Sequence, residues 1–140
     1  MLEPAFFDTN LFLYAYSQAP EDRPKRDRAR KLFEQYQPVI SVQVIQEFIA
    51  TALRKPHLGI DDEKIDEFLA ICACHTIQPI HLETLLQATA LRRRYSLSHW
   101  DSSILAAACA SGSEILFSED LQHNFSVQRL RVRNPFLPAV

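Results

Sequence analysis

Short apolar runs alternate with longer segments of helical periodicity along the whole of this 140-residue chain. The strand-like runs are residues 2–7, 39–42, 76–80, 114–118 and 129–133, and the helical patterns are residues 9–17, 21–36, 44–55, 61–72, 82–95 and 101–111. Strands that alternate with helices form a parallel sheet that is covered on both faces. A chain of this length fits one domain. We therefore expect a single α/β domain over residues 1–140 with a central, mostly parallel sheet.

Prolines and acidic residues mark the expected ends of several elements. Pro38 should end the second helix before the second strand, and Pro79 should mark an edge or the end of the third strand. The acidic residues 61–63 fall in the first turn of the fourth helix, where negative charge stabilises the positive end of the helix dipole. The segment 101–111 is apolar all round, which predicts a helix buried against the sheet.

The composition excludes several classes of protein. A hydrophobic share of 47% and a charged share of 23% are those of an ordinary globular protein rather than a disordered chain. No transmembrane span or secretory leader is visible, so we expect a cytoplasmic protein without a membrane partner. Two glycines leave little room for a glycine-rich phosphate loop, which disfavours nucleotide-cofactor chemistry.

The three cysteines, Cys72, Cys74 and Cys109, do not form the pattern of a disulfide framework, because their number is odd and two of them share one helical segment. We expect them to be small apolar core residues in a reducing compartment. Zinc binding is not expected, since Cys72, Cys74 and His75 lack a second ligand pair at the spacing of a zinc site.

Positive charge is concentrated in three stretches, residues 23–31, 92–94 and 129–133, although the formal net charge is -2. Each stretch could be a solvated face of a helix or strand, or part of a surface for nucleic acid. Arg26, Arg30 and the triplet 92–94 are candidates for contacts with phosphates, and the sequence does not choose among them.

Four carboxylates stand where a strand-like run ends or a helical pattern begins, namely Asp8, Glu47, Asp101 and Asp120. If the strands are parallel neighbours, their carboxyl ends share one edge of the sheet, where open α/β folds bind ligands. Carboxylates about 5 Å apart repel by about 3 kcal/mol per pair at an effective dielectric of about 20, so a cluster needs protons or a cation. An all-oxygen site suits Mg²⁺ or Mn²⁺, which could activate water against a phosphodiester. The pattern thus predicts a metal-dependent nuclease.

Each of these acids also has a purely structural explanation. Asp8 and Asp101 precede residues that suit a helix start, so both could be N-caps. Glu47 could face water, and Asp120 could form a turn. The structural explanation would have to hold four times, always beside apolar segments, so the joint pattern favours the site.

Motifs across the chain resemble the PIN domain family. They are Phe6-Phe7-Asp8-Thr9-Asn10, Ser41 with Gln46-Glu47-Phe48, His99-Trp100-Asp101 before an alanine-rich helix, and Ser118-Glu119-Asp120-Leu121. The closing Asn134-Pro135-Phe136 is similar to the tail of many bacterial PIN-domain toxins of the VapC type. Four motifs in this order, spread over essentially the whole chain, make the resemblance specific.

This resemblance implies a three-layer α/β/α domain with Mg²⁺- or Mn²⁺-dependent endoribonuclease activity. The positions that bind the metal, directly or through water, are matched by Asp8, Glu47, Asp101 and Asp120. Asn10 and Ser118 match polar positions that support the site by hydrogen bonding. The fourth acid is the most variable in the family, and Glu119 is the nearest rival of Asp120.

The resemblance also implies partners. Members of the family usually form homodimers, act on RNA and are commonly neutralised by a VapB-type antitoxin whose tail enters the groove. On this expectation the chain is the toxin component of a toxin–antitoxin pair.

The expected mechanism uses one or two metal ions and needs no protein nucleophile. Trp100 could stack on an unpaired base, although core packing is its expected role. His99 could tune Asp101, although a structural role is expected.

Other functions are weighed against this one. A PIN-like module could bind RNA or a protein without cutting, but no acid is missing, so catalysis is favoured. A phosphohydrolase of the haloacid dehalogenase type, with an aspartyl-phosphate at Asp8, needs a second aspartate two positions later, where this chain has Asn10. A serine hydrolase has no support, because no Gly-x-Ser-x-Gly motif is present.

Overall fold

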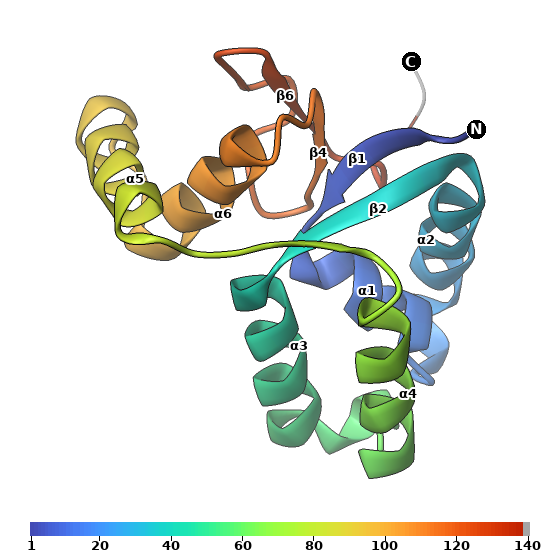
Figure 1. Cartoon of the computed structure of the whole chain (residues 1–140). Coiled ribbons are helices and arrows are strands. Elements are labelled where there is room, and N and C mark those ends of the chain that lie inside the picture. Colours follow the sequence, from blue (N-terminus) through green and yellow to red (C-terminus); the bar gives the residue numbers. More distant parts are fainter. Residues whose placement is uncertain (139–140) are drawn as a thin grey trace.

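The computed structural model describes residues 1–138 and contains a six-stranded sheet in the order β3-β2-β1-β4-β6-β5 (Figure 1). The strands are β1 (Glu3–Phe7), β2 (Tyr36–Ser41), β3 (Thr76–Gln78), β4 (Ile115–Phe117), β5 (Ser126–Val127) and β6 (Leu130–Arg133). Every pairing from β3 across to β6 is parallel, whereas β5 runs antiparallel to β6. The expected α/β class with a mostly parallel sheet is confirmed.

Helices cover both faces of this sheet. They are α1 (Thr9–Tyr16), α2 (Arg23–Gln35), α3 (Val42–Arg54), α4 (Asp62–Cys72), α5 (Leu82–Tyr95) and α6 (His99–Ala110), with 3₁₀ turns at Pro20–Asp22 and Pro56–Leu58. The chain steps outward from β1 to β3 and then crosses back to β4, so right-handed crossovers place the two sets of helices on opposite faces. Figure 1 shows α5 and α6 on one side of the sheet, α1 and α2 on the other, and α3 and α4 extending beyond the carboxyl ends of the strands. None of the helices in residues 1–138 combines the length and hydropathy needed to cross a bilayer.

The core is built from the buried sheet, aromatic stacks and the alanine-rich helix. Phe7 of β1 stacks on Phe33 of α2 at 4.7 Å between ring centroids, and Phe48 stacks on Phe68 at 3.9 Å, which joins α3 to α4. Every residue of α6 from 102 to 108 is buried, as its all-round apolar pattern predicted. These contacts fix the strand ends from which the site residues project.

Two local expectations about elements were wrong. Pro38 lies inside β2, because α2 already ends at Gln35. β3 pairs with β2 only from Val39 onward, so one side of the strand at Pro38 makes no ladder hydrogen bonds and tolerates a residue without an N–H. Between the runs 114–118 and 129–133, where no strand was expected, lies β5, whose two residues are too few to give a periodic signal.

The capping of α4 and the exposure of two cysteines follow from where that helix begins and ends. Asp61 is the N-cap of α4 and accepts a 3.0 Å hydrogen bond from the Lys64 amide, while Asp62 and Glu63 lie in the first turn. All three cysteines are free thiols, as expected. Cys72 is buried and Cys109 is half-buried, but Cys74 is exposed, because α4 ends at Cys72 and leaves Cys74 in the following turn.

Candidate functional site

The site lies where β1 and β4 run side by side. After β1 the chain continues to β2 on one side, and after β4 it continues to β6 on the other side, and such a switch in direction opens a crevice at the carboxyl ends of the strands. The amide of Asp8 donates to the Phe117 carbonyl at 3.0 Å, and the amide of Ser118 donates to the Arg133 carbonyl at 3.1 Å. The ends of β1, β4 and β6 are therefore held level, and Asp8 and Ser118 meet at the crevice.

Asp8 is a buried carboxylate with both oxygens engaged. Its Oδ1 accepts a 2.7 Å bond from the Thr9 amide, which makes Asp8 the N-cap of α1, and its Oδ2 accepts a 2.7 Å bond from the Ser118 hydroxyl. Burial raises the pKa of Asp8 from 3.8 to about 7, the bonds from Ser118 and Thr9 oppose that rise, and the charges of Asp120 and Glu47 add to it. The N-cap interpretation of Asp8 is therefore correct, and its raised pKa is compatible with a role as a site acid.

Glu47 is oriented by donors from two helices. The Thr9 hydroxyl of α1 donates to its Oε2 at 2.9 Å, and the side-chain Nε2 of Gln43, one turn earlier on α3, donates to its Oε1 at 2.9 Å. Gln43 also donates to the Trp100 carbonyl at 3.2 Å, which ties the start of α3 to the start of α6. The side chain therefore faces the site rather than bulk water.

Asp120 lies on the turn that follows β4. Its Oδ2 accepts a 3.2 Å bond from the side chain of Asn10, and its amide donates to the Ser118 hydroxyl at 3.2 Å. Burial raises the pKa of Asp120, the Asn10 bond opposes the rise, and the charges of Glu119 and Asp101 add to it. Asn10 and Ser118 thus hydrogen-bond to two of the proposed site acids, Asp120 and Asp8.

Glu119, the rival of Asp120, is occupied elsewhere. The hydroxyl of Tyr14 donates to its Oε1 at 2.5 Å, and the ammonium of Lys25 forms an ion pair with its Oε2. Lys25 also donates to the Tyr14 oxygen at 3.2 Å, so the three side chains form a closed network. This network neutralises Glu119 and favours Asp120 as the acid that is available to the site.

Asp101 lies in the first turn of α6, but it is not the N-cap that the sequence suggested. The cap is Ser98, whose hydroxyl accepts a 3.1 Å bond from the Asp101 amide. The carboxylate of Asp101 is therefore free of a capping role. Its charge raises the pKa of Asp120, which places the two carboxylates within electrostatic range.

The donor set and the burial of Asp8 are compatible with a hard divalent cation. The acids and their neighbours offer oxygen ligands, which suit Mg²⁺ or Mn²⁺, and a nearby positive charge would lower the raised pKa of Asp8. Across residues 1–138, no three His, Cys, Asp or Glu side chains are already arranged closely enough to hold an ion. A cation would therefore need bridging water or a rearrangement of the acids.

A groove of about 540 Å³ is lined by two of these acids, Glu47 and Asp120. Asp8, with 6% of its surface exposed, and Asp101 are not among the residues that line it. At the far end of α3 it is lined by Arg54, Lys55 and His57. Sequence reasoning missed these three because they stand in a short polar run between a helix and a turn, with no recognisable motif.

Two of the arginines that were candidates for phosphate contacts also make structural hydrogen bonds. Arg26 donates to the Ser17 carbonyl at 3.3 Å and Arg30 to the Ala15 carbonyl at 3.0 Å, so both hold the end of α1 against α2. The triplet 92–94 lies in the last turn of α5, on the opposite face of the sheet from α1 and α2 (Figure 1).

The side chain of Trp100 is exposed, so the expectation of core packing was wrong. Its side chain was expected to pack in the core, yet it is 63% exposed, and His99 beside it is exposed as well. The residue lies in the first turn of α6, before the fully buried part of that helix begins at Ser102. The two rings contact each other edge to face at 4.9 Å between centroids, outside the core.

Comparison with known proteins identifies the family. The sequence pattern of the PIN domain matches residues 5–126. The chain belongs to the PIN domain family. No sequence among curated proteins matches it.

Solved structures share the fold of this PIN domain at low sequence identity. A toxin–antitoxin complex from Klebsiella pneumoniae matches with a TM-score of 0.69 and 22% identity, over 94% of this chain and 98% of the other. VapC20 from Mycobacterium tuberculosis, a toxin that cleaves the Sarcin-Ricin loop, matches with a TM-score of 0.67 and 16% identity, over 83% of this chain and 91% of the other. VapBC2 from Rickettsia felis, bound to a promoter DNA fragment, matches with a TM-score of 0.65 and 18% identity, over 93% of this chain and 97% of the other. The expected three-layer PIN architecture is thereby confirmed.

Proposed function

We propose that this PIN domain is a Mg²⁺- or Mn²⁺-dependent endoribonuclease and the toxin component of a toxin–antitoxin pair. The observation that carries the proposal is the hydrogen-bond network at the switch point of the sheet, in which Ser118 joins Asp8 to Asp120 and Thr9, next to Asp8, holds Glu47. Family membership supports the nuclease class, and the three similar structures support the toxin assignment. On this proposal the whole chain forms one nuclease domain that acts on RNA in the cytoplasm.

In the proposed reaction Asp8 anchors the metal. Thr9 and Ser118 fix its two oxygens, and burial separates it from bulk water. Glu47, Asp101 and Asp120 complete the anionic site. A divalent ion held there would supply Lewis-acid stabilisation of the scissile phosphate and a more acidic water for attack.

The rest of the groove would hold the RNA. Arg54 and Lys55 line it beyond Glu47, so they are the cations best placed to contact phosphates that flank the cleaved bond. Such contacts fix the register of the strand across the acids without reading its sequence.

We further propose that the chain forms a homodimer and is neutralised by a VapB-type antitoxin. Similar structures are toxin–antitoxin complexes, which supports the antitoxin. Large apolar side chains of α5 and α6 are exposed, which supports a protein interface there: Leu82, Leu85, Leu86 and Trp100. Light scattering of the purified chain should give twice the monomer mass, and a monomer at micromolar concentration would contradict the dimer.

The nuclease proposal is tested by RNA cleavage in the presence and absence of Mg²⁺. Wild type should cleave a mixture of cellular RNA with Mg²⁺ but not with EDTA, and mapping of the new ends should identify the sites. Asp8→Asn and Asp101→Asn should abolish cleavage while they leave the circular dichroism spectrum unchanged. Arg93→Ala, a change on the opposite face, is the matched control and should cleave normally. Cleavage by both acid variants would overturn the proposal, and RNA binding without cleavage by wild type would indicate a silent binding module.

A further inference from the structure

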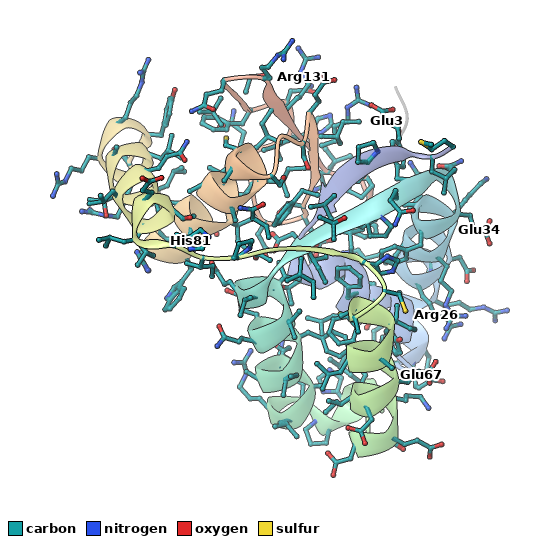
Figure 2. The ribbon with its side chains drawn as sticks, in the orientation of Figure 1. Glu3, Arg26, Glu34, Glu67, His81 and Arg131 are labelled. Atoms are coloured by element: carbon teal, nitrogen blue, oxygen red, sulfur yellow. The ribbon has the colours of Figure 1, made fainter. Side chains whose placement is uncertain are left out.

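Two of the three basic stretches of the sequence, residues 23–31 and 129–133, meet on one side of the sheet. Arg131 and Arg133 alternate with buried residues along β6, so both project from the same exposed face of that strand, and Figure 2 labels Arg131 there. Arg28 of α2 reaches toward the same region, because its Nε–H donates to the Pro135 carbonyl at 3.1 Å. The C-terminal segment thus connects α2 to the end of β6.

A cavity of about 630 Å³ lies between α2, the ends of β4 and β6, and residues 134–138. We call it the C-terminal pocket, and its lining includes Lys25, Arg28, Arg133, Tyr36 and Phe136. Its volume falls within the range of roughly 300–1,000 Å³ that is typical of pockets for small ligands. Its lining is basic and aromatic, whereas the lining of the groove is acidic beside Glu47 and Asp120.

The charges of this pocket are not balanced by the protein. Lys25 is paired with Glu119, but within residues 1–138 neither Arg28 nor Arg133 forms an ion pair with a carboxylate. Both guanidinium groups therefore keep donors in the planar arrangement that binds a phosphate oxygen pair. The bond of Arg28 to the Pro135 carbonyl uses one of its donors only.

The aromatic rings of the pocket are held in place by neighbours. Tyr36 packs edge to face against Phe117 at 5.0 Å, and Phe136 packs edge to face against Tyr14 at 5.1 Å between centroids. Both rings are half-buried, so each keeps part of its surface open. Arginines beside partly open aromatic rings form the combination with which proteins bind unpaired nucleotides.

The C-terminal pocket and the groove share a wall. Tyr14 lines the groove and contacts Phe136, which lines the pocket. Lys25 lines the pocket and pairs with Glu119, which lines the groove. A strand of RNA that lies across the acids would therefore reach the pocket within a short distance.

We propose that the C-terminal pocket binds one nucleotide of the single-stranded RNA segment next to the segment in the groove. Arg28 and Arg133 hold its phosphate, and its base lies against Tyr36 and Phe136. The identity of the ligand as RNA rests on the proposed function.

The test measures RNA binding separately from cleavage. The protein is the full-length Asp8→Asn variant with EDTA, and the probe is a fluorescently labelled single-stranded RNA octamer of mixed sequence, followed by anisotropy. Arg28→Ala/Arg133→Ala in this background should bind roughly tenfold more weakly, and the slope of log Kd against log salt should fall by about one per lost phosphate contact. Arg133→Ala alone, which leaves the Arg28 bond to Pro135 in place, should lose several-fold in affinity.

The matched control removes equal charge at a distant place. Arg93→Ala/Arg94→Ala changes the end of α5 on the opposite face and should alter affinity less than twofold. Equal affinity of the pocket variants and their parent would overturn the proposal, and so would an equal loss in the control, because the effect would then be general electrostatics. Absence of RNA binding by the parent would also overturn it.

The same measurements separate this proposal from the nuclease proposal. If wild type cleaves RNA while the pocket variants bind as tightly as their parent, only the pocket assignment fails. If wild type does not cleave, yet the Asp8→Asn parent binds RNA and the pocket variants lose affinity, the pocket stands and the nuclease assignment fails.

Discussion

The hydroxyl of Ser118 donates a 2.7 Å hydrogen bond to Oδ2 of Asp8, across a sequence separation of 110 residues. The hydroxyl oxygen of Ser118 in turn accepts bonds from the amides of Asp120 and Leu121 at 3.2 and 3.3 Å. One fully buried side chain thus joins the acid that follows β1 to the turn that carries the fourth acid. The geometry of the site depends on this serine.

Ser118→Ala should damage both stability and metal affinity. It removes the bond that lowers the pKa of Asp8 and leaves buried polar groups without a partner, which costs about 1–3 kcal/mol of unfolding free energy. Urea denaturation and titration calorimetry with Mn²⁺ measure the two effects. Ser103→Ala is the matched control, since Ser103 is a buried serine whose hydroxyl makes no hydrogen bond. It should be neutral or slightly stabilising, and an equal cost in both variants would refute the role of Ser118.

The raised pKa of Asp8 predicts a pH dependence of stability in metal-free protein. The folded value is about 7 and the ordinary value is 3.8, so between these limits the folded state binds more protons than the unfolded state. Stability should therefore fall as pH rises from about 4 to about 7 and then level off, with about 4 kcal/mol as the ceiling of the loss.

Asp8→Asn should remove this dependence, because asparagine stays neutral and still caps a helix. In EDTA the variant should be more stable than wild type at pH 8 and similar to it near pH 4, as measured by thermal denaturation. Mg²⁺ should raise the melting temperature of wild type at pH 8 but not that of the variant. Parallel stability curves from pH 4 to 8 would show that Asp8 titrates normally.

Thr9→Val should misplace Glu47 with little change in shape. The hydroxyl of Thr9 holds Oε2 of Glu47, and its loss should lower the rate of RNA cleavage roughly tenfold to a hundredfold, because a displaced catalytic group is costly. Thr51→Val changes a threonine that lines the same groove from α3 and should cleave at the wild-type rate. Equal rates of RNA cleavage by wild type and Thr9→Val would show that the Thr9–Glu47 hydrogen bond is not needed for catalysis.

Asp120→Asn and Glu119→Gln should differ, although the residues are adjacent. Asp120 is bound by the neutral side chain of Asn10, whereas Glu119 is neutralised by Lys25 and Tyr14. The Asp120 variant should therefore bind Mn²⁺ at least tenfold more weakly, while Glu119→Gln should keep its metal affinity. The reverse order in calorimetry would make Glu119 the fourth acid.

Much of the architecture could be predicted because local patterns agree with the final packing. Residues 82–95 form α5 as predicted, and α6 is buried all round because its alanine-rich surface leaves no polar face. Pro38 was misread because its tolerance depends on where β3 stops pairing, which no local signal contains. Trp100 was misread for a similar reason, since its exposure depends on where the buried part of α6 begins.

The site could be predicted only in part. Acids at strand ends are visible in the sequence once a parallel sheet is assumed, and Asp8 lies where that logic places it. The partners of the acids are not visible, because Thr9 contacts Glu47 over a separation of 38 residues and Lys25 contacts Glu119 over one of 94. Such contacts depend on the order of the strands in the sheet, which no local sequence pattern specifies.

We propose that the four acids together bind one divalent ion. The most direct test is a crystal structure of the protein with Mn²⁺ and its anomalous difference map. The account predicts a peak at the carboxyl ends of β1 and β4, with Asp8 oxygen about 2.1 Å away and the other acids bound directly or through water. A peak at another place would contradict this binding site. The absence of any peak at millimolar Mn²⁺, with no metal between the four carboxylates, would contradict it as well.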